Sequence, residues 1–464
     1  MSLEIAPPSR LAASQPELAL RSGLARARSR GEVAWVSWSE RLGELPDLFE
    51  LFQTAEQQGE RRFLMSGGEP SQTLLGVGLA GELAFEDATA GIDQTAKWFG
   101  RVEFEGGSGE LGPLLLGGLA FAPATDRVRD PIWRPFGNAR FALPEFLFSE
   151  GALIVSVRVA PDDDEDALLR RVAVRRALLL EKPTAAERVE ASLALPAGDD
   201  LSGRYATTAA RLIDAIRAGG ARKVVLAEQE RIPVAGRLPA LPILRALAEA
   251  HPSCTVYAMG IGERTFLGVT PECLVAVRGG SVRAAAVGGT SNRVRDPLAD
   301  ALRHSRKERA EHDFVVRGIE TSMRPFCASV EVPSEPTGLG AGRAQHLWTE
   351  LCGTLRAPTH VLELVAALHP TAAVAGTPRD RALELICEHE QFDRGWYAGP
   401  IGWLDRTGQG EFQVALRCGL LTPGEIRLYA GAGLVEASDP AREADEVQLK
   451  LLALRDALVR ACGS

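Results

Sequence analysis

Cysteine and histidine are scarce in this sequence, and their spacing argues against a zinc site. The chain of 464 residues contains seven of each. No C-x-x-C pair and no H-E-x-x-H motif occurs, although zinc sites commonly use such closely spaced ligands. We therefore expect no zinc, and we expect scattered buried thiols in a reducing cytoplasm.

Long apolar runs and an excess of basic residues are also missing. No stretch reaches the roughly 18 uncharged apolar residues that a membrane-spanning helix needs. Lysine and arginine number 52 against 61 for aspartate and glutamate, which gives a formal net charge of −9. That balance argues against a nucleic-acid surface and against polybasic attachment to a membrane.

Apolar material is sufficient for a large core, because hydrophobic residues make up 45% of the chain. Residues 1–30 contain no apolar signal core, and we expect a flexible tail there. The stretch 182–202 is rich in proline, alanine, glycine and aspartate, which predicts a linker. We therefore divide the rest of the chain into an N-terminal half, 31–200, and a C-terminal half, 201–464, where most motifs lie.

The predicted strands come in runs with helices between them. Near the C-terminus, strand-like runs at 398–405, 411–421 and 425–434 are separated by the turn sequences RTGQG and TPG. This spacing predicts an antiparallel meander. Without strict alternation of strand and helix, the pattern favours a mixed α+β architecture over a doubly wound sheet.

Two predicted helices carry glutamates three residues apart. Glu308 and Glu311 lie in SRKERAEHDF, whereas Glu443 and Glu446 lie in PAREADEVQLK, which ends at Lys450. One explanation is local: Glu308 completes a capping box and Glu446 pairs with Lys450 on the surface. The other is that all four carboxylates face one cleft around a divalent cation, for which oxygen ligands favour Mg²⁺ or Ca²⁺ over zinc.

Other residues also have an ordinary and a functional explanation. Lys223 opens a predicted strand and is either an exposed strand end or part of a site. Glu272 is a turn carboxylate, or it is buried with a raised pKa and acts as a general acid. Arg417 forms a surface ion pair or binds a carboxylate through its forked donors. His346 is a satisfied core histidine or a functional one.

Ten segments occur in the order typical of one enzyme family. They are KVVLAEQE, TPECLVAV, AVGGTSNR, SRKERAEHDFVV, QHLWTEL, LHPTAAVAGTPRDRAL, FDRGWYAGPIGW, EFQVALR, LYAGAGLVEASDP and EADEVQLK. In these segments the sequence resembles the chorismate-utilising enzymes, and among them the isochorismate synthases of menaquinone or siderophore synthesis. The resemblance is strong over about 200–460 and loose before that. It implies two packed antiparallel β-sheets with helices outside.

The resemblance also implies roles. Lys223 matches the general base that activates a water, and Glu272 matches the general acid that protonates the departing C4 hydroxyl. Glu311 and Glu446 match Mg²⁺ ligands, with Glu308 and Glu443 holding metal-bound waters. The residues that match substrate-binding positions are Gly289, Thr290, His346, Ala373, Tyr397, Arg417, Gly431, Gly433 and Lys450.

Two positions favour isochorismate as the product. Lys at 223 favours the water-adding enzymes, since anthranilate synthases carry Gln there. Ala373 stands where salicylate synthases tend to have Thr, so we expect the reaction to stop before pyruvate elimination. Salicylate synthase activity is the alternative. A chorismate-binding sensor without turnover and an unrelated Mg²⁺-dependent phosphoryl-transfer enzyme are further alternatives, although the chain lacks a phosphate-cradling G-x-x-x-x-G-K-[ST] loop.

The expected partner is therefore chorismate, a small molecule, with Mg²⁺ as the cofactor. We expect no nucleic acid and no membrane as partners. We also expect a cytoplasmic monomer or weak homodimer.

Overall fold

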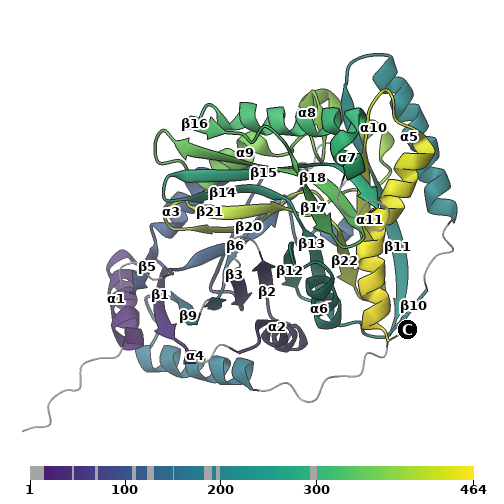
Figure 1. Ribbon diagram of the computed structural model, residues 1–464. Coiled ribbons are helices and arrows are strands. Elements are labelled where there is room, and N and C mark those ends of the chain that lie inside the picture. Colours follow the sequence, from purple (N-terminus) through teal and green to yellow (C-terminus); the bar gives the residue numbers. More distant parts are fainter. Residues whose placement is uncertain are drawn as a thin grey trace, which may run out of the picture.

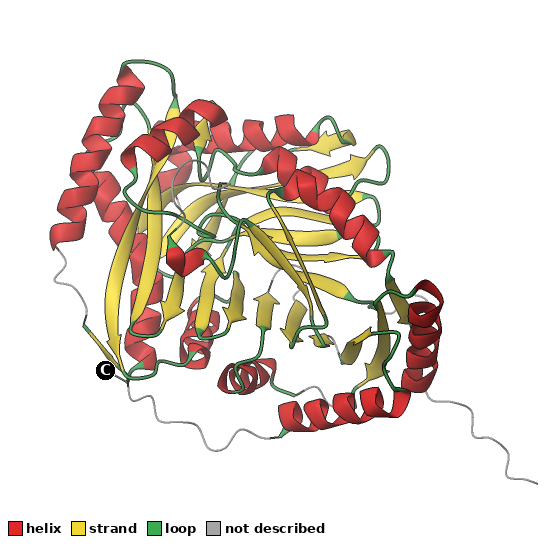
Figure 2. Cartoon of the chain, turned by 180° about the vertical axis from the view of Figure 1, so that it is seen from behind, coloured by secondary structure: helices red, strands yellow, loops and turns green. Residues whose placement is uncertain are grey.

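The computed structural model describes residues 15–43, 46–67, 72–106, 111–122, 130–149, 151–181, 191–194, 199–292 and 300–463. Two large, mostly antiparallel sheets form the centre of the molecule, and helices cover their outer faces (Figure 1). Seen from behind, the same arrangement of layers is visible (Figure 2). The α+β prediction with two packed antiparallel sheets is confirmed.

The larger sheet contains thirteen strands of the described residues. Its neighbours pair antiparallel except for β1 and β5, which are parallel. In spatial order the strands are β10 (Ser192–Leu193), β11 (Lys223–Ala235), β23 (Glu425–Leu434), β22 (Cys418–Thr422), β13 (Arg264–Thr270), β12 (Thr255–Ile261), β2 (Arg62–Gly67), β3 (Gln72–Val77), β8 (Phe146–Ser149), β9 (Ala152–Val159), β1 (Ala34–Arg41) and β5 (Val102–Glu105), with β19 (Gly376–Thr377) beside β11.

The smaller sheet contains ten strands of the described residues. In spatial order they are β16 (Cys327–Glu331), β18 (Ala344–Leu355), β15 (Ser281–Asn292), β14 (Cys273–Arg278), β21 (Gly410–Val414), β20 (Pro400–Asp405), β6 (Leu114–Leu119), β7 (Ala139–Leu143) and β4 (Gly81–Phe85), with β17 (Thr337–Ala341) beside β18. Gly279 and Gly280 both have positive φ, which allows the tight turn between β14 and β15.

The helices lie outside these sheets. They are α1 (Gln15–Arg30), α2 (Leu48–Gln57), α3 (Ala88–Phe99), α4 (Glu165–Leu180), α5 (Asp199–Arg217), α6 (Ala240–Ala250), α7 (Asp300–His304), α8 (Arg306–Met323), α9 (Val361–Leu368), α10 (Arg379–His389) and α11 (Pro440–Ala461). Helix α8 packs on β15, and α11 packs on β23 beside α5 (Figure 1). None of the described helices is long and apolar enough to cross a bilayer.

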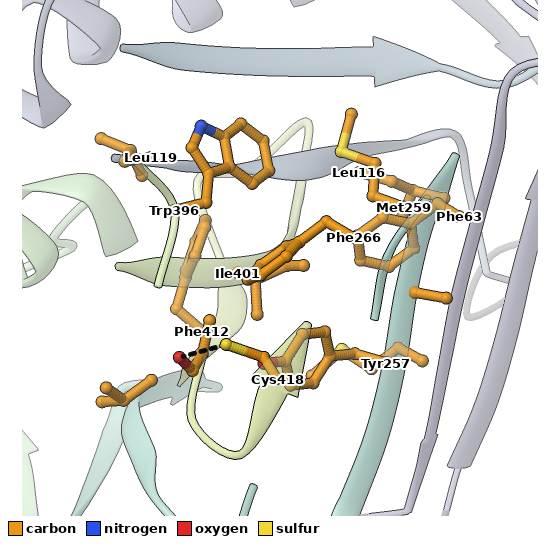
Figure 3. Close-up of a cluster of buried hydrophobic side chains, with 14 of the residues drawn as sticks. Phe63, Leu116, Leu119, Tyr257, Met259, Phe266, Trp396, Ile401, Phe412 and Cys418 are labelled. Carbon is orange, nitrogen blue, oxygen red and sulfur yellow. Dashed lines mark hydrogen bonds between the residues drawn. The ribbon is translucent and has the colours of Figure 1, made fainter. Parts of the chain in front are cut away.

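The core lies between the two sheets. Figure 3 shows Phe63 and Phe266 from the larger sheet together with Leu116 and Ile401 from the smaller one, around Trp396. The rings of Phe266 and Trp396 meet edge to face, with centroids 6.5 Å apart. Burial of such large side chains from both faces holds the sheets together.

Both sheets combine strands from the two halves of the chain. Strand β2 pairs with β12, and β6 pairs with β20. The boundary at residue 200 therefore divides the sequence and does not separate two cores. Of the predicted linker, 182–190 and 195–198 lie outside the described residues.

Two sequence predictions about local structure are wrong. Residues 15–30 of the expected tail form α1, which buries Leu20 and Leu24 against β1, while 1–14 lie outside the described residues. The predicted C-terminal meander is broken after β21. Strands β20 and β21 belong to the smaller sheet, whereas β22 and β23 belong to the larger one. The chain changes sheets over residues 415–417, within what the sequence suggested was one strand.

Candidate active site

The two acidic helices are fixed by their caps and by their buried faces. Ser305 caps α8, where its hydroxyl accepts a hydrogen bond from the Glu308 backbone N–H at 3.3 Å. Asp439 caps α11, with Pro440 in the first turn. Each helix then buries an apolar stripe, which comprises Val315, Ile319 and Met323 in α8 and Val447, Leu451, Leu454 and Leu458 in α11. The glutamates of both helices therefore lie at the edge of a buried face.

The helices meet through their charged side chains. Lys307 of α8 donates to Glu443 of α11 at 3.0 Å and lies 3.9 Å from Glu308. Between them and the sheets is a cavity of about 80 Å³. Every residue predicted to be catalytic, substrate-binding or metal-ligating lines it: Lys223, Glu272, Gly289, Thr290, Glu311, His346, Ala373, Tyr397, Arg417, Gly431, Gly433, Glu446 and Lys450. Glu308 and Glu443 are not among the lining residues.

Lys223 is a buried amine rather than an exposed strand end. Its side chain is only 2% exposed, and its Nζ lies 2.9 Å from Glu311 Oε1. Burial acts to raise the pKa of Glu311, but the ammonium groups of Lys223, Lys450 and Lys307 outweigh it, and the pKa lies below its ordinary value. Gly433 leaves the space in which Lys223 and Glu311 meet. A Cβ atom at this position would lie only 2.5 Å from Glu311 Oε1.

A second lysine–glutamate pair lies on α11. Lys450 and Glu446 are 2.7 Å apart, as the local explanation predicted, but the pair is half-buried in the cavity wall. Lys450 also donates to the Gly431 carbonyl at 2.8 Å, and Thr290 donates its hydroxyl to Glu446 at 2.9 Å. The pair therefore ties α11 to both sheets.

The four carboxylates influence one another. Burial raises the pKa of Glu308 to about 7, with Glu311 and Glu446 adding to the effect. Burial and the neighbouring Glu446 likewise raise the pKa of Glu443. In the described part of the chain no three His, Cys, Asp or Glu side chains form a ready set of metal ligands. The arrangement fits a cation held directly by only two carboxylates and completed by water and an anionic ligand, which is the usual pattern for Mg²⁺.

Glu272 provides a proton donor in the same cavity. Its side chain is 2% exposed, and its Oε1 has no hydrogen-bond partner among the described residues. Burial raises its pKa to about 8, although Lys223, Lys450 and Arg417 oppose the shift. The carboxyl group is therefore mostly protonated at neutral pH, unlike an exposed turn carboxylate.

Arg417 lies where the chain crosses between the sheets, and its φ is 39°. It is buried and does not form the surface ion pair considered from the sequence. One guanidinium nitrogen, Nη2, contacts His346 Nε2, while Nη1 has no partner among the described residues. His346 Nδ1 lies 2.9 Å from the Gly289 carbonyl. Because a carbonyl can only accept, Nδ1 carries the proton and Nε2 accepts from Arg417.

His346 thus serves as an acceptor that orients Arg417. Burial and the adjacent Arg417 hold its pKa well below the ordinary value, so the imidazole is neutral. Gly289 has a φ of +64°, a backbone conformation that favours glycine. The unpaired Arg417 Nη1 remains available to a carboxylate.

The sequence analysis missed a buried ion pair beside the cavity. Arg394 binds Glu390 with side chains only 3% and 2% exposed. Arg394 also donates to the carbonyls of Val374 at 2.9 Å and Val225 at 2.8 Å, while Glu390 accepts from the Ala227 N–H at 2.8 Å. The pair thereby fixes β11 relative to the loop that carries Ala373. The sequence offered one signal for this pair: Arg394 lies inside the aromatic run FDRGWY. A charge among aromatic residues is expected to be buried, and a buried charge needs a partner.

Tyr429 was missed as well. It lines the cavity and stacks on Tyr397, with centroids 5.4 Å apart and rings inclined by 16°. Its position two residues before Gly431 on the same strand offered a signal, because alternate residues share a face.

The fold and this cavity define a chorismate-utilising class of protein. A family model described as chorismate binding enzyme matches residues 22–459, and the chain belongs to that family. It is 39% identical over 360 residues to the salicylate biosynthesis isochorismate synthase of Pseudomonas aeruginosa, covering 75% of each chain. It is 30% identical over 457 residues to the isochorismate synthase MenF of Bacillus subtilis, covering 94% of this chain and 96% of the relative.

A solved structure shows the same fold. The menaquinone-specific isochorismate synthase MenF of Escherichia coli superimposes with a TM-score of 0.74 at 23% identity. The alignment covers 96% of this chain and 100% of the Escherichia coli chain.

Proposed function

We propose that this protein is an isochorismate synthase, which adds water at C2 of chorismate while the C4 hydroxyl leaves. One observation carries the proposal: a buried amine, Lys223, and a protonated carboxylic acid, Glu272, line the same small cavity. Water addition with loss of a hydroxyl needs a base for the incoming water and an acid for the departing group.

The cavity supplies groups for a substrate with two carboxylates. Arg417 presents Nη1, and Lys450 adds a second positive charge. Glu311 and Glu446 would hold Mg²⁺, and Glu308 and Glu443, which lie on the same two helices, would bind its waters. When bound, the cation neutralises substrate charge and orients the ring carboxylate.

The proton transfers follow from the two side chains. Lys223 takes a proton from the water as its oxygen bonds to C2, and the ring double bonds shift. Glu272 gives its proton to the C4 oxygen as that bond breaks, which releases water. One water enters and one leaves, so substrate and product are isomers.

Lys223 must first lose its carboxylate partner. In the ligand-free protein it is held by Glu311 at 2.9 Å. A base must be neutral, so the ammonium group of Lys223 has to give its proton to solvent before it can accept one from the reacting water. Glu311 is thus both the partner of Lys223 and one of the residues that would hold Mg²⁺.

The relatives support an isochorismate product, and the names of a menaquinone-specific and a vibriobactin-specific isochorismate synthase among them support menaquinone or siderophore synthesis as its use. Both sequence relatives are named as isochorismate synthases. The cysteines of the described chain are free thiols, which supports a cytoplasmic enzyme.

The test is to incubate purified protein with chorismate and Mg²⁺ and to separate the products by chromatography. We expect an equilibrium mixture of chorismate and isochorismate, with no turnover after chelation of the metal. Pyruvate release would show salicylate synthase activity instead. Binding of chorismate without a new product would show a sensor.

A further inference from the structure

A second and larger cavity lies on the outer side of the loop that carries Ala373. It has a volume of about 320 Å³ and is formed by α8, the end of α9 and the start of α10. It shares no lining residue with the catalytic cavity. The proposed reaction assigns it no role.

This cavity is positively charged. Arg222, Arg317 and Arg379 line it, and none of its lining residues, all of them described, is acidic. The chain as a whole is acidic, with a net charge of −9. A cavity wall with three arginines and no carboxylate therefore differs in charge from the rest of the protein. Asp380, which acts on Arg379, lies outside the cavity wall.

Two of these guanidinium groups are free to bind. Arg222 stacks over the ring of Phe314 at 5.2 Å, which leaves its N–H edge open. Within the described residues, the guanidinium groups of Arg222 and Arg317 have no hydrogen-bonding or ion-pair partner. Arg317 lies one helical turn after Phe314 on α8, and both line the cavity beside Arg222.

The third arginine is already fixed. Arg379 donates to the carbonyls of Ala367 at 2.8 Å and Leu368 at 3.2 Å, at the C-terminus of α9. It is also the first residue of α10, and Pro378, which precedes it, provides no side-chain cap. A fixed cation at an uncapped helix start adds positive potential to the cavity.

The rest of the wall is mixed, because Thr321, Ser322, Thr371 and Thr377 add hydroxyl groups to an apolar part. Phe314, Ile319, Leu368 and Pro370 contribute hydrocarbon surface. The geometry points to a binding site for a small ring-containing organic acid with two carboxylates, in which the arginines bind the carboxylates and the apolar wall contacts the ring. Arginine suits this ligand because its forked donors match a planar carboxylate.

Occupancy of this cavity would affect the catalytic one, because one segment forms a wall of both. Thr371 and Ala372 face the outer cavity, whereas Ala373 and Val374 face the catalytic cavity. The Arg222 backbone N–H donates to the Thr377 carbonyl at 2.8 Å, next to Lys223. The site is therefore an effector site, placed to change substrate binding.

Calorimetry with phthalate as the probe tests the binding part on the full chain without metal. We expect wild-type protein to bind phthalate and the double variant R222A/R317A to bind it about tenfold more weakly or worse. R324A is the matched control, because Arg324 ends the same helix outside the cavity and should keep wild-type affinity. The charge-reversal variant R317E gives an independent check if the double variant unfolds.

Three outcomes would overturn the assignment. Equal phthalate affinity of the double variant and wild type would remove the arginines from the site. Competition by chorismate, with loss of phthalate binding in R417A, would place the probe in the catalytic cavity. Inorganic phosphate binding as tightly as phthalate would exclude recognition of a ring.

Steady-state kinetics test the effector part, which rests on the proposed function. Phthalate should change the KM for chorismate in wild type and leave it unchanged in R222A/R317A. An unchanged KM in wild type, despite binding seen by calorimetry, would overturn the effector role alone. Absence of any turnover would instead overturn the proposed function and leave the binding result intact.

Discussion

Replacing Glu272 by glutamine tests whether a buried carboxylic acid carries the proton for this reaction. In the native protein its pKa is raised to about 8 by burial, against 4.5 for an ordinary glutamate. Between these two values the folded protein retains a proton that the unfolded chain has lost. Native stability therefore falls as the pH rises from about 5 to about 8.

The magnitude follows from the same two values. Each pH unit between them corresponds to about 1.4 kcal/mol, so the native state is less stable than at acidic pH by roughly 3 kcal/mol at pH 7 and roughly 4 to 5 kcal/mol above pH 8. Glutamine has a similar shape and does not titrate. The stability of Glu272→Gln relative to wild type should therefore rise steadily over this range, while turnover is lost because the amide cannot donate an acidic proton.

Urea unfolding of both proteins between pH 5 and pH 8.5 measures this difference. Glu411→Gln is the control, because Glu411 is also buried but binds Arg278 at 3.2 Å and Gln413 at 2.9 Å. That substitution should only destabilise, since Arg278 loses its partner. A stability difference between Glu272→Gln and wild type that stays constant with pH would refute the reasoning. Wild-type kcat/KM should also fall above about pH 8, where the acid ionises.

Three further substitutions test the remaining parts of the site. Lys223→Ala should still bind chorismate in calorimetry but form no isochorismate, and near-normal turnover would remove it as the base. Glu446→Ala should lose Mg²⁺-dependent turnover with an unchanged circular dichroism spectrum; retained metal dependence would leave Glu446 as a simple partner of a lysine. Glu390→Gln should lower the free energy of unfolding by about 3 to 5 kcal/mol, because Arg394 would become an uncompensated buried charge. A loss below about 1 kcal/mol in urea unfolding would contradict the role of that pair.

Local sequence patterns were enough to predict α8 and α11. Spacing predicted the apolar stripes, Ser305 as the cap of α8, and Ser438 or Asp439 as the cap of α11, of which Asp439 is the cap observed. Spacing could not decide whether Glu446 paired locally or faced a site, and the structure shows that it does both. The grouping of the site residues came from the family resemblance.

Features that depend on distant segments were not predictable from local patterns. Arg417 follows an alternating strand pattern, yet the strand ends at Val414 and the chain crosses to the other sheet. Glu390 and Arg394 have the spacing of an ordinary surface pair on a helix. The pair is buried because distant segments meet around Arg394, which donates to the carbonyls of Val225 and Val374 and lies over the ring of Phe121.

Each sheet contains strands from both halves of the chain, and this has a consequence for folding while the protein is being translated. During translation, β6 leaves the ribosome long before β20, which begins at Pro400 and covers its free edge. Until then one edge of the apolar strand β6 lacks its partner, although β7 can pair with the other edge, and such an open edge is a template for aggregation. A chain terminated before Pro400 could not close the smaller sheet, so β6 keeps this open edge until β20 has been made.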